Sequence, residues 1–166
     1  MAQSITSAKT SLNQIPALHK WFVKQYNKPQ TILDFGCGKY DKGMEYLEEH
    51  GHIVWGYDPY HQPEYYNQIL LQQDTDYDAI LCANVLNVIQ DELDIRNALN
   101  LISNLSNMAF FSIYEGDKTG IGKETTKGYQ RNEKIHEYVK LIKEFYPTVF
   151  RQGNIIIAMK ENEDEN

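Results

Sequence analysis

The chain has 166 residues, of which 42% are hydrophobic and 23% charged, and this balance predicts a globular fold with its own core. The formal net charge at pH 7 is −7, and it is −3 when the four acids of the last six residues are left out. No basic field therefore points to nucleic acid. We expect a single domain over residues 1–160 and a disordered acidic tail over 161–166.

The two cysteines, Cys37 and Cys82, are too few for a disulfide framework or a zinc site, and each is expected to be a small buried residue near a strand end. The five histidines show no ligand spacing, so we expect no metal and interpret all five as surface or structural residues. The first ten residues are polar, unlike a signal peptide, and no stretch approaches the ~20 apolar residues of a membrane span. These features predict a cytoplasmic protein with no membrane partner.

An amphipathic helix is predicted over about residues 11–27. Apolar side chains from Leu12 to Tyr26 recur at spacings of three and four, and they form one stripe that is expected to pack on a sheet. His19 and Lys20 are expected to face water. Pro29 follows the end of this helix.

The stretch after this helix organises the rest of the chain. Residues 31–35 are typical of a strand, Gly36 and Gly38 break it, and a helical pattern follows over about 41–50. Glycines at a strand-to-helix turn let the backbone approach a ligand closely, and the helix N-terminus offers free N–H groups. The pattern therefore indicates a binding site at this turn.

An acid at the end of the next strand supports that interpretation. Residues 52–58 are predicted to form a strand that ends at Asp58, which lies 24 residues beyond Asp34. This is close to the spacing of about 20 residues that places a carboxylate on ribose hydroxyls in nucleotide-binding βαβ units.

Strands and helices alternate along the remaining chain, which is typical of a parallel sheet covered on both faces. The prediction is an α/β fold with a mostly parallel seven-stranded sheet, an antiparallel strand at the end and helices on both faces. The expected strands after the first two span 67–71, 77–83, 108–114, 149–151 and 155–159, and the expected helices span about 91–106 and 131–146.

Several stretches between about residues 30 and 160 resemble the class I S-adenosylmethionine (SAM)-dependent methyltransferases, which have a Rossmann-like fold. These stretches are 33–38, 57–58, and 77–81 running into 85–89. More narrowly, 56–60, 84–89 and segments between 114 and 132 resemble methyltransferases associated with DNA phosphorothioation and related phage-encoded proteins. The resemblance implies SAM as the cofactor.

The resemblance also implies roles for individual residues. Gly36 and Gly38 would pass under the methionine part of SAM, Asp34 would hold its ammonium group, and Asp58 would accept from the two ribose hydroxyls. Asp74 would face the adenine amino group, with Thr75 or Asp76 as rivals. Asn84 would lie near the transferred methyl group, although Asn84 and Asn87 could both be helix caps. The implied cofactor-binding residues are Asp34, Gly36, Cys37, Gly38, Asp58, Pro59, Asp74 and Asn84. One departure is Tyr40, which stands where the family often has a third glycine.

The long loop over 114–132 follows a strand at the carboxyl end of the sheet, where open α/β sheets bind ligands. Its Gly-Ile-Gly-Lys run is not a phosphate loop, because Asp117 replaces the first glycine and Glu124 follows the lysine. We interpret the loop as a mobile lid over the methyl acceptor, and the alternative is a surface loop whose Gln and Asn cap the next helix. Its candidate contacts are Tyr114, Glu115, Tyr129, Gln130 and Asn132, and the candidate catalytic residues are Asn84, Tyr114, Glu115 and Gln130.

Two hypotheses from different classes follow. The first is a SAM-dependent methyltransferase that acts on an unidentified acceptor, either a small molecule or a nucleic-acid-related one, although the net charge does not support nucleic acid. The chain lacks an Asn/Asp-Pro-Pro-aromatic motif at 84–87, which argues against independent adenine or cytosine N-methylation. The second is a non-catalytic SAM- or nucleotide-binding module of the same fold, with a protein partner. A minor third option is an enzyme that cleaves SAM.

Overall fold

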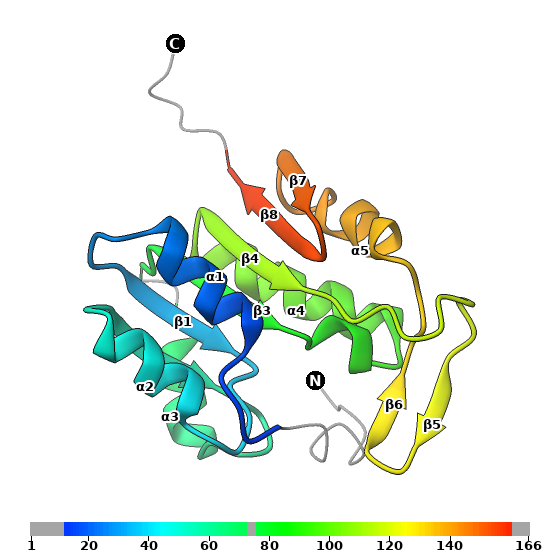
Figure 1. Cartoon of the computed structure of the whole chain (residues 1–166), viewed down its shortest axis with the longest axis horizontal. Coiled ribbons are helices and arrows are strands. Elements are labelled where there is room, and N and C mark those ends of the chain that lie inside the picture. Colours follow the sequence, from blue (N-terminus) through cyan, green and yellow to red (C-terminus); the bar gives the residue numbers. More distant parts are fainter. Residues whose placement is uncertain (1–11, 73–75, 161–166) are drawn as a thin grey trace.

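A six-stranded sheet lies at the centre of the computed structural model, which describes residues 12–72 and 76–160 (Figure 1). Four strands from one edge inward pair in parallel, and β8 runs antiparallel to both of its neighbours. In spatial order the strands are β2 (Ile53–Tyr57), β1 (Thr31–Phe35), β3 (Ala79–Ala83), β4 (Met108–Ser112), β8 (Ile155–Met159) and β7 (Thr148–Gln152).

Helices cover both faces of this sheet, as Figure 1 shows. The helices α1 (Ala17–Gln25) and α2 (Lys42–Glu49) pack on one face, and α3 (Glu64–Leu70), α4 (Glu92–Leu105) and α5 (Ile135–Ile142) pack on the other. The predicted α/β architecture, with mostly parallel strands and an antiparallel strand near the end, is therefore confirmed.

Alternation along β1 decides which side chains face which layer. Ile32 packs in the cluster under α1, whereas Leu33 and Phe35 pack in the cluster under α4. Asp34 has the same parity as Ile32, so its carboxylate points towards α1 and contacts His19 there. A charged side chain is thus directed into a buried layer at the carboxyl end of a central strand.

The strand predicted over 67–71 is wrong, because these residues belong to α3 and its C-cap. Pro63 precedes the helix and supplies a fixed φ at its N-cap. Tyr66 and Leu70 then face the core at a spacing of four, which is a helical pattern. The main sheet consequently has six strands among the described residues where seven were predicted.

The N-terminal helix is shorter than the predicted span of 11–27. It begins at Ala17, because Pro16 adopts an extended conformation and disfavours helix at Ile15. Leu12 is therefore outside the helix, and it is 56% exposed. The expectation that His19 faces water is also wrong, since His19 is fully buried.

The segment expected to be a long loop contains a separate two-stranded hairpin. Its strands are β5 (Lys123–Thr125) and β6 (Gly128–Gln130), which pair antiparallel. Figure 1 shows this hairpin projecting beyond the carboxyl end of β4. The predicted tail over 161–166 lies outside the described residues. In the described ranges no helix is both long and apolar enough to cross a membrane.

His52, between α2 and β2, gives the fold a testable pH dependence. Its side chain is buried, its Nδ1 accepts a hydrogen bond from the Gln30 backbone N–H at 3.1 Å, and burial lowers its pKa below 6.5. As the pH falls through about 6.5, the unfolded chain takes up a proton that the folded chain resists, so the free energy of unfolding decreases until the folded-state pKa is passed.

We therefore expect His52→Gln to lose less stability than the wild type between about pH 7.5 and about pH 5.5. Urea unfolding at several pH values measures this difference. His136→Gln, on the exposed surface of α5, serves as the control. If the free energy of unfolding fell equally in the wild type and in His52→Gln over this pH range, His52 would not be the source of the pH dependence.

Candidate functional site

The turn after β1 can be formed only by residues that tolerate a positive φ. Gly36 and Gly38 have φ values of +84° and +79°. The backbone N–H groups of Gly36 and Cys37 both donate to the carbonyl of Tyr57, at 2.7 and 3.0 Å. A Cβ atom at Gly36 would lie 2.4 Å from Cγ2 of Val85, so the turn is held between the end of β2 and the segment after β3.

Asp58 fastens this turn to the end of β2. Its Oδ2 accepts from the Gly38 N–H at 2.9 Å, and its Oδ1 accepts from the N–H groups of Tyr60 and His61 at 2.8 and 3.1 Å. Asn67 of α3 binds the Asp58 backbone twice. Its Nδ2 donates to the Asp58 carbonyl, and its Oδ1 accepts from the Asp58 N–H. The carboxylate is therefore fixed in one orientation, with a remaining lone pair on Oδ2.

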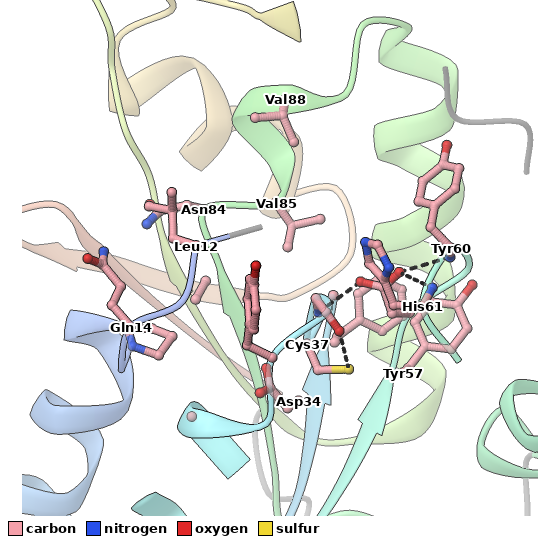
Figure 2. Close-up of a pocket in the computed structure, with 18 of the residues that line it drawn as sticks. Leu12, Gln14, Asp34, Cys37, Tyr57, Tyr60, His61, Asn84, Val85 and Val88 are labelled. Carbon is pink, nitrogen blue, oxygen red and sulfur yellow. Dashed lines mark hydrogen bonds between the residues drawn. The ribbon is translucent and has the colours of Figure 1, made fainter. Parts of the chain in front are cut away.

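These elements surround a cavity of about 230 Å³ at the carboxyl ends of β1, β2 and β3 (Figure 2). Figure 2 shows Leu12, Gln14 and Asn84 towards one end and Tyr60 and His61 towards the other. The walls of the cavity come from the segment before α1, the glycine turn, residues 57–61 and the segment after β3. The lining residues at the glycine turn and the strand ends are Asp34, Phe35, Gly36, Cys37, Gly38, Tyr57, Asp58, Pro59, Ala83, Asn84 and Val85.

Aromatic side chains form the wall near Asp58. The rings of Phe35 and Tyr57 are stacked, with centroids 4.6 Å apart. Burial, together with the Asp58 charge, raises the pKa of both Tyr57 and Tyr60. Both phenols are therefore neutral at physiological pH, so this end of the cavity pairs flat uncharged surfaces with one carboxylate.

Asp34 supplies a second carboxylate to the cavity. It is 4% exposed, and its Oδ2 lies 3.0 Å from Nε2 of His19. The histidine comes from α1, which covers that face of the sheet. The cavity therefore holds two fixed carboxylates, one at the end of β1 and one just after β2.

Asn84 occupies a position of backbone strain. Its φ is +55°, a left-handed conformation that asparagine tolerates better than most side chains, and its N–H continues the β3–β4 pairing by donating to Ser112 at 2.9 Å. Asn84 does not cap the short helix η2 (Leu86–Val88), whose N-cap is Val85. Strain of this kind clusters at functional sites.

Cys37 lies in the cavity wall but is not an activated nucleophile. Burial, together with Asp34 and Asp58, raises the pKa of its thiol, so it remains protonated at neutral pH. Its sulfur also fills the space beside Gly56, where a Cβ atom would come within 2.8 Å of Sγ. Cys82 is fully buried in β3, and burial raises its pKa in the same way.

The segment 114–132 is fastened mainly by its own polar side chains. Glu115 accepts from the Ile135 N–H at 2.9 Å and so caps α5, and Gln130 accepts from the Asn87 amide at 3.1 Å. Arg131 donates to the carbonyls of Ile89 and Gln90. These contacts tie the hairpin to the segment after β3.

Three of the four candidate catalytic residues thus lie away from the cavity wall. Among the described residues that line it, Asn84 is present, whereas Tyr114, Glu115 and Gln130 are absent. Pro59 and Cys37 do line it, and Asp74 with its rival Thr75 lies outside the described residues. Sequence reasoning missed the approach of α1 to Asp34, although Ile15, His19 and Phe22 have the spacings of four and three that place His19 on the apolar stripe.

No protein-family profile matches the chain, and no curated protein matches it. Among solved structures, it is similar to the magnesium protoporphyrin IX methyltransferase of Synechocystis with bound SAM, at 16% identity over 87% of this chain and 77% of that one, with a TM-score of 0.61. It is also similar to a TehB-like SAM-dependent methyltransferase of Corynebacterium glutamicum, at 19% identity over 90% of both chains (TM-score 0.55). A SAM-dependent methyltransferase of Methanosarcina mazei shares 12% identity over 92% of this chain and 100% of that one (TM-score 0.64). The chain therefore has the Rossmann-like fold of SAM-dependent methyltransferases.

The capping contact of Glu115 predicts a structural effect. Glu115→Ala removes an acceptor from the first turn of α5 and is expected to lower the free energy of unfolding by about 1 kcal/mol. Glu115→Gln keeps an oxygen acceptor, so its free energy of unfolding should fall less. Urea unfolding measures both, with the exposed neighbour Tyr114→Ala as the control. Unfolding energies for Glu115→Ala that equal those of the control would contradict the capping role.

Proposed function

We propose that the chain binds SAM in this cavity and transfers its methyl group to an acceptor. The observation that carries the proposal is the Gly36–Gly38 turn fastened to the Asp58 carboxylate, in a fold shared with SAM-dependent methyltransferases. The Synechocystis enzyme has been solved with SAM and with S-adenosylhomocysteine (SAH) bound. The alternative is a non-catalytic binding module of the same fold.

The charged and aromatic groups of the cavity suit this cofactor. SAM carries an ammonium group, two ribose hydroxyls and a planar base, and the cavity offers two buried carboxylates and an aromatic wall. The volume of about 230 Å³ is below the range of about 300–1,000 Å³ that is usual for ligand pockets. A cavity of this volume would leave part of SAM uncovered, which is consistent with transfer because a methyl donor must stay open to a second molecule.

The residues divide the work of positioning. Asp58 would accept from one ribose hydroxyl through the free lone pair of Oδ2, because backbone N–H groups occupy its other acceptor positions. Asp34 would pair with the ammonium group, and the two glycines would allow close approach of the methionine part. Asn84 would stand beside the methyl group. When bound, SAM would supply a methyl group on a positively charged sulfur, so that a nucleophile of the acceptor bonds to the methyl carbon while the C–S bond breaks and SAH leaves as a neutral thioether. The protein's contribution is then alignment and exclusion of water.

The acceptor is proposed only as a class, a small molecule or a nucleic-acid-related molecule. The hairpin β5–β6 and the segment 114–122 lie beyond the carboxyl end of β4, and we propose that they cover the acceptor (Figure 1). The narrower kinship with methyltransferases of DNA phosphorothioation systems and phages, and action in the cytoplasm, belong to this proposal. The kinship rests on the sequence stretches 56–60, 84–89 and 114–132.

Binding is tested by calorimetric titration with SAM and SAH. We expect both to bind the wild type. We expect Asp58→Ala to lower the affinity for SAH by about tenfold or more, because it removes the charged acceptor proposed for a ribose hydroxyl. Asp78→Ala is the matched control, since Asp78 also accepts a backbone N–H at a strand end, from Thr31 at 2.8 Å, but lies outside the cavity lining. Absence of binding to the wild type would overturn the proposal.

Transfer is tested with SAM labelled in its methyl carbon. Incubation with cell extract is expected to move the label onto a small molecule or nucleic acid, and Asp58→Ala should reduce this transfer by at least the same factor as binding. Asp78→Ala should transfer as the wild type does. Binding without transfer to any extract would contradict the enzyme hypothesis and favour the non-catalytic module.

A further inference from the structure

The contact between His19 and Asp34 joins an otherwise unassigned histidine to the cavity. Nε2 of His19 lies 3.0 Å from Oδ2 of Asp34, and the two side chains are 0% and 5% exposed. The residues are 15 positions apart and come from different elements, α1 and β1. Asp34 lines the cavity, whereas His19 is not among its lining residues. The histidine therefore reaches the cavity only through its contact with the Asp34 carboxylate.

The imidazole ring has little freedom in this position. A Cβ atom at Gly43 of α2 would lie 3.1 Å from Cδ2 of His19 and 3.2 Å from its Nε2. Gly43 is itself buried, so the bare backbone of α2 closes over the ring. Leu18 and Phe22 on either side of His19 pack into the sheet. The ring is therefore clamped between two helices and the end of β1.

The second ring nitrogen indicates where the proton lies. Nδ1 of His19 is buried and has no hydrogen-bond partner among the described residues. A proton on Nδ1 would be a buried donor without an acceptor, whereas a proton on Nε2 is donated to Asp34. The favoured arrangement is thus a neutral imidazole that donates from Nε2 to an ionised carboxylate.

We propose that His19 is a positioning residue for cofactor binding, holding Oδ2 of Asp34 so that the ionised carboxylate presents its other oxygen to the amino group of the cofactor. This inference rests on the proposed function. A carboxylate has two oxygens with about four acceptor positions, so one bond from His19 leaves capacity for an ammonium donor. Because the imidazole is neutral, the negative charge remains available to that donor.

The experiment compares two ligands that differ in the amino-acid part. SAH carries the amino group, and 5′-methylthioadenosine lacks the whole amino-acid end while keeping the adenosine. In calorimetric titrations, His19→Leu is expected to lower the affinity for SAH about tenfold and to change the affinity for methylthioadenosine less than about twofold. His19→Gln, whose amide nitrogen can take the place of Nε2, is expected to restore most of the SAH affinity.

A double-mutant cycle links the effect to Asp34. In an Asp34→Asn background, His19→Leu should no longer change SAH affinity selectively, because the charge that it positions is gone. If His19→Leu does not fold, as judged by circular dichroism, His19→Asn replaces it, since its amide is too short to reach Oδ2.

The outcomes separate the inference from the proposed function. Equal weakening of both ligands, or unchanged SAH affinity in His19→Leu, would overturn the positioning role while leaving cofactor binding intact. A wild type that binds neither SAH nor methylthioadenosine would overturn the proposed function, and with it this inference.

Discussion

The hydrogen bond from the Gly38 N–H to the Asp58 carboxylate is the contact on which the site depends. It joins the turn after β1 to the residue that follows β2, and the carbonyl of Tyr57 binds the same turn from its other side. Parallel pairing of β1 with β2 in register, Phe35 beside Tyr57, brings these ends together. Neither strand alone would form this part of the cavity, because the turn after β1 supplies the N–H donors and the end of β2 supplies their acceptors.

The second layer of the site follows from the period of a strand. The side chain of Asp34 points to the face covered by α1, one residue after Leu33 packs against the opposite layer. An acid at that position needs a partner when a helix covers it, and His19 provides one. The same helix cover that builds the core therefore also determines how the carboxylate meets the cavity.

Local patterns predicted most of the fold and the glycine turn with Asp58. The features that they did not predict depend on contacts between segments that are distant in the sequence. The glycine turn, Asp58 and the strands of the parallel sheet follow from spacing within about 30 residues. The strand predicted at 67–71 failed because Pro63 starts a helix there, and a short apolar run does not distinguish the two. His19 could have been placed on the apolar stripe by its spacing, but its partner Asp34 could not. The capping role of Glu115 depends on Ile135, 20 residues away, which no local pattern reveals.

The most direct test of the central claim is a crystal structure of the protein grown with SAH. We expect a ribose hydroxyl within about 3 Å of Oδ2 of Asp58, the amino group on the other oxygen of Asp34, and the His19 contact retained. SAH bound elsewhere on the protein, or bound here with its ribose turned away from Asp58, would contradict the proposed cofactor site.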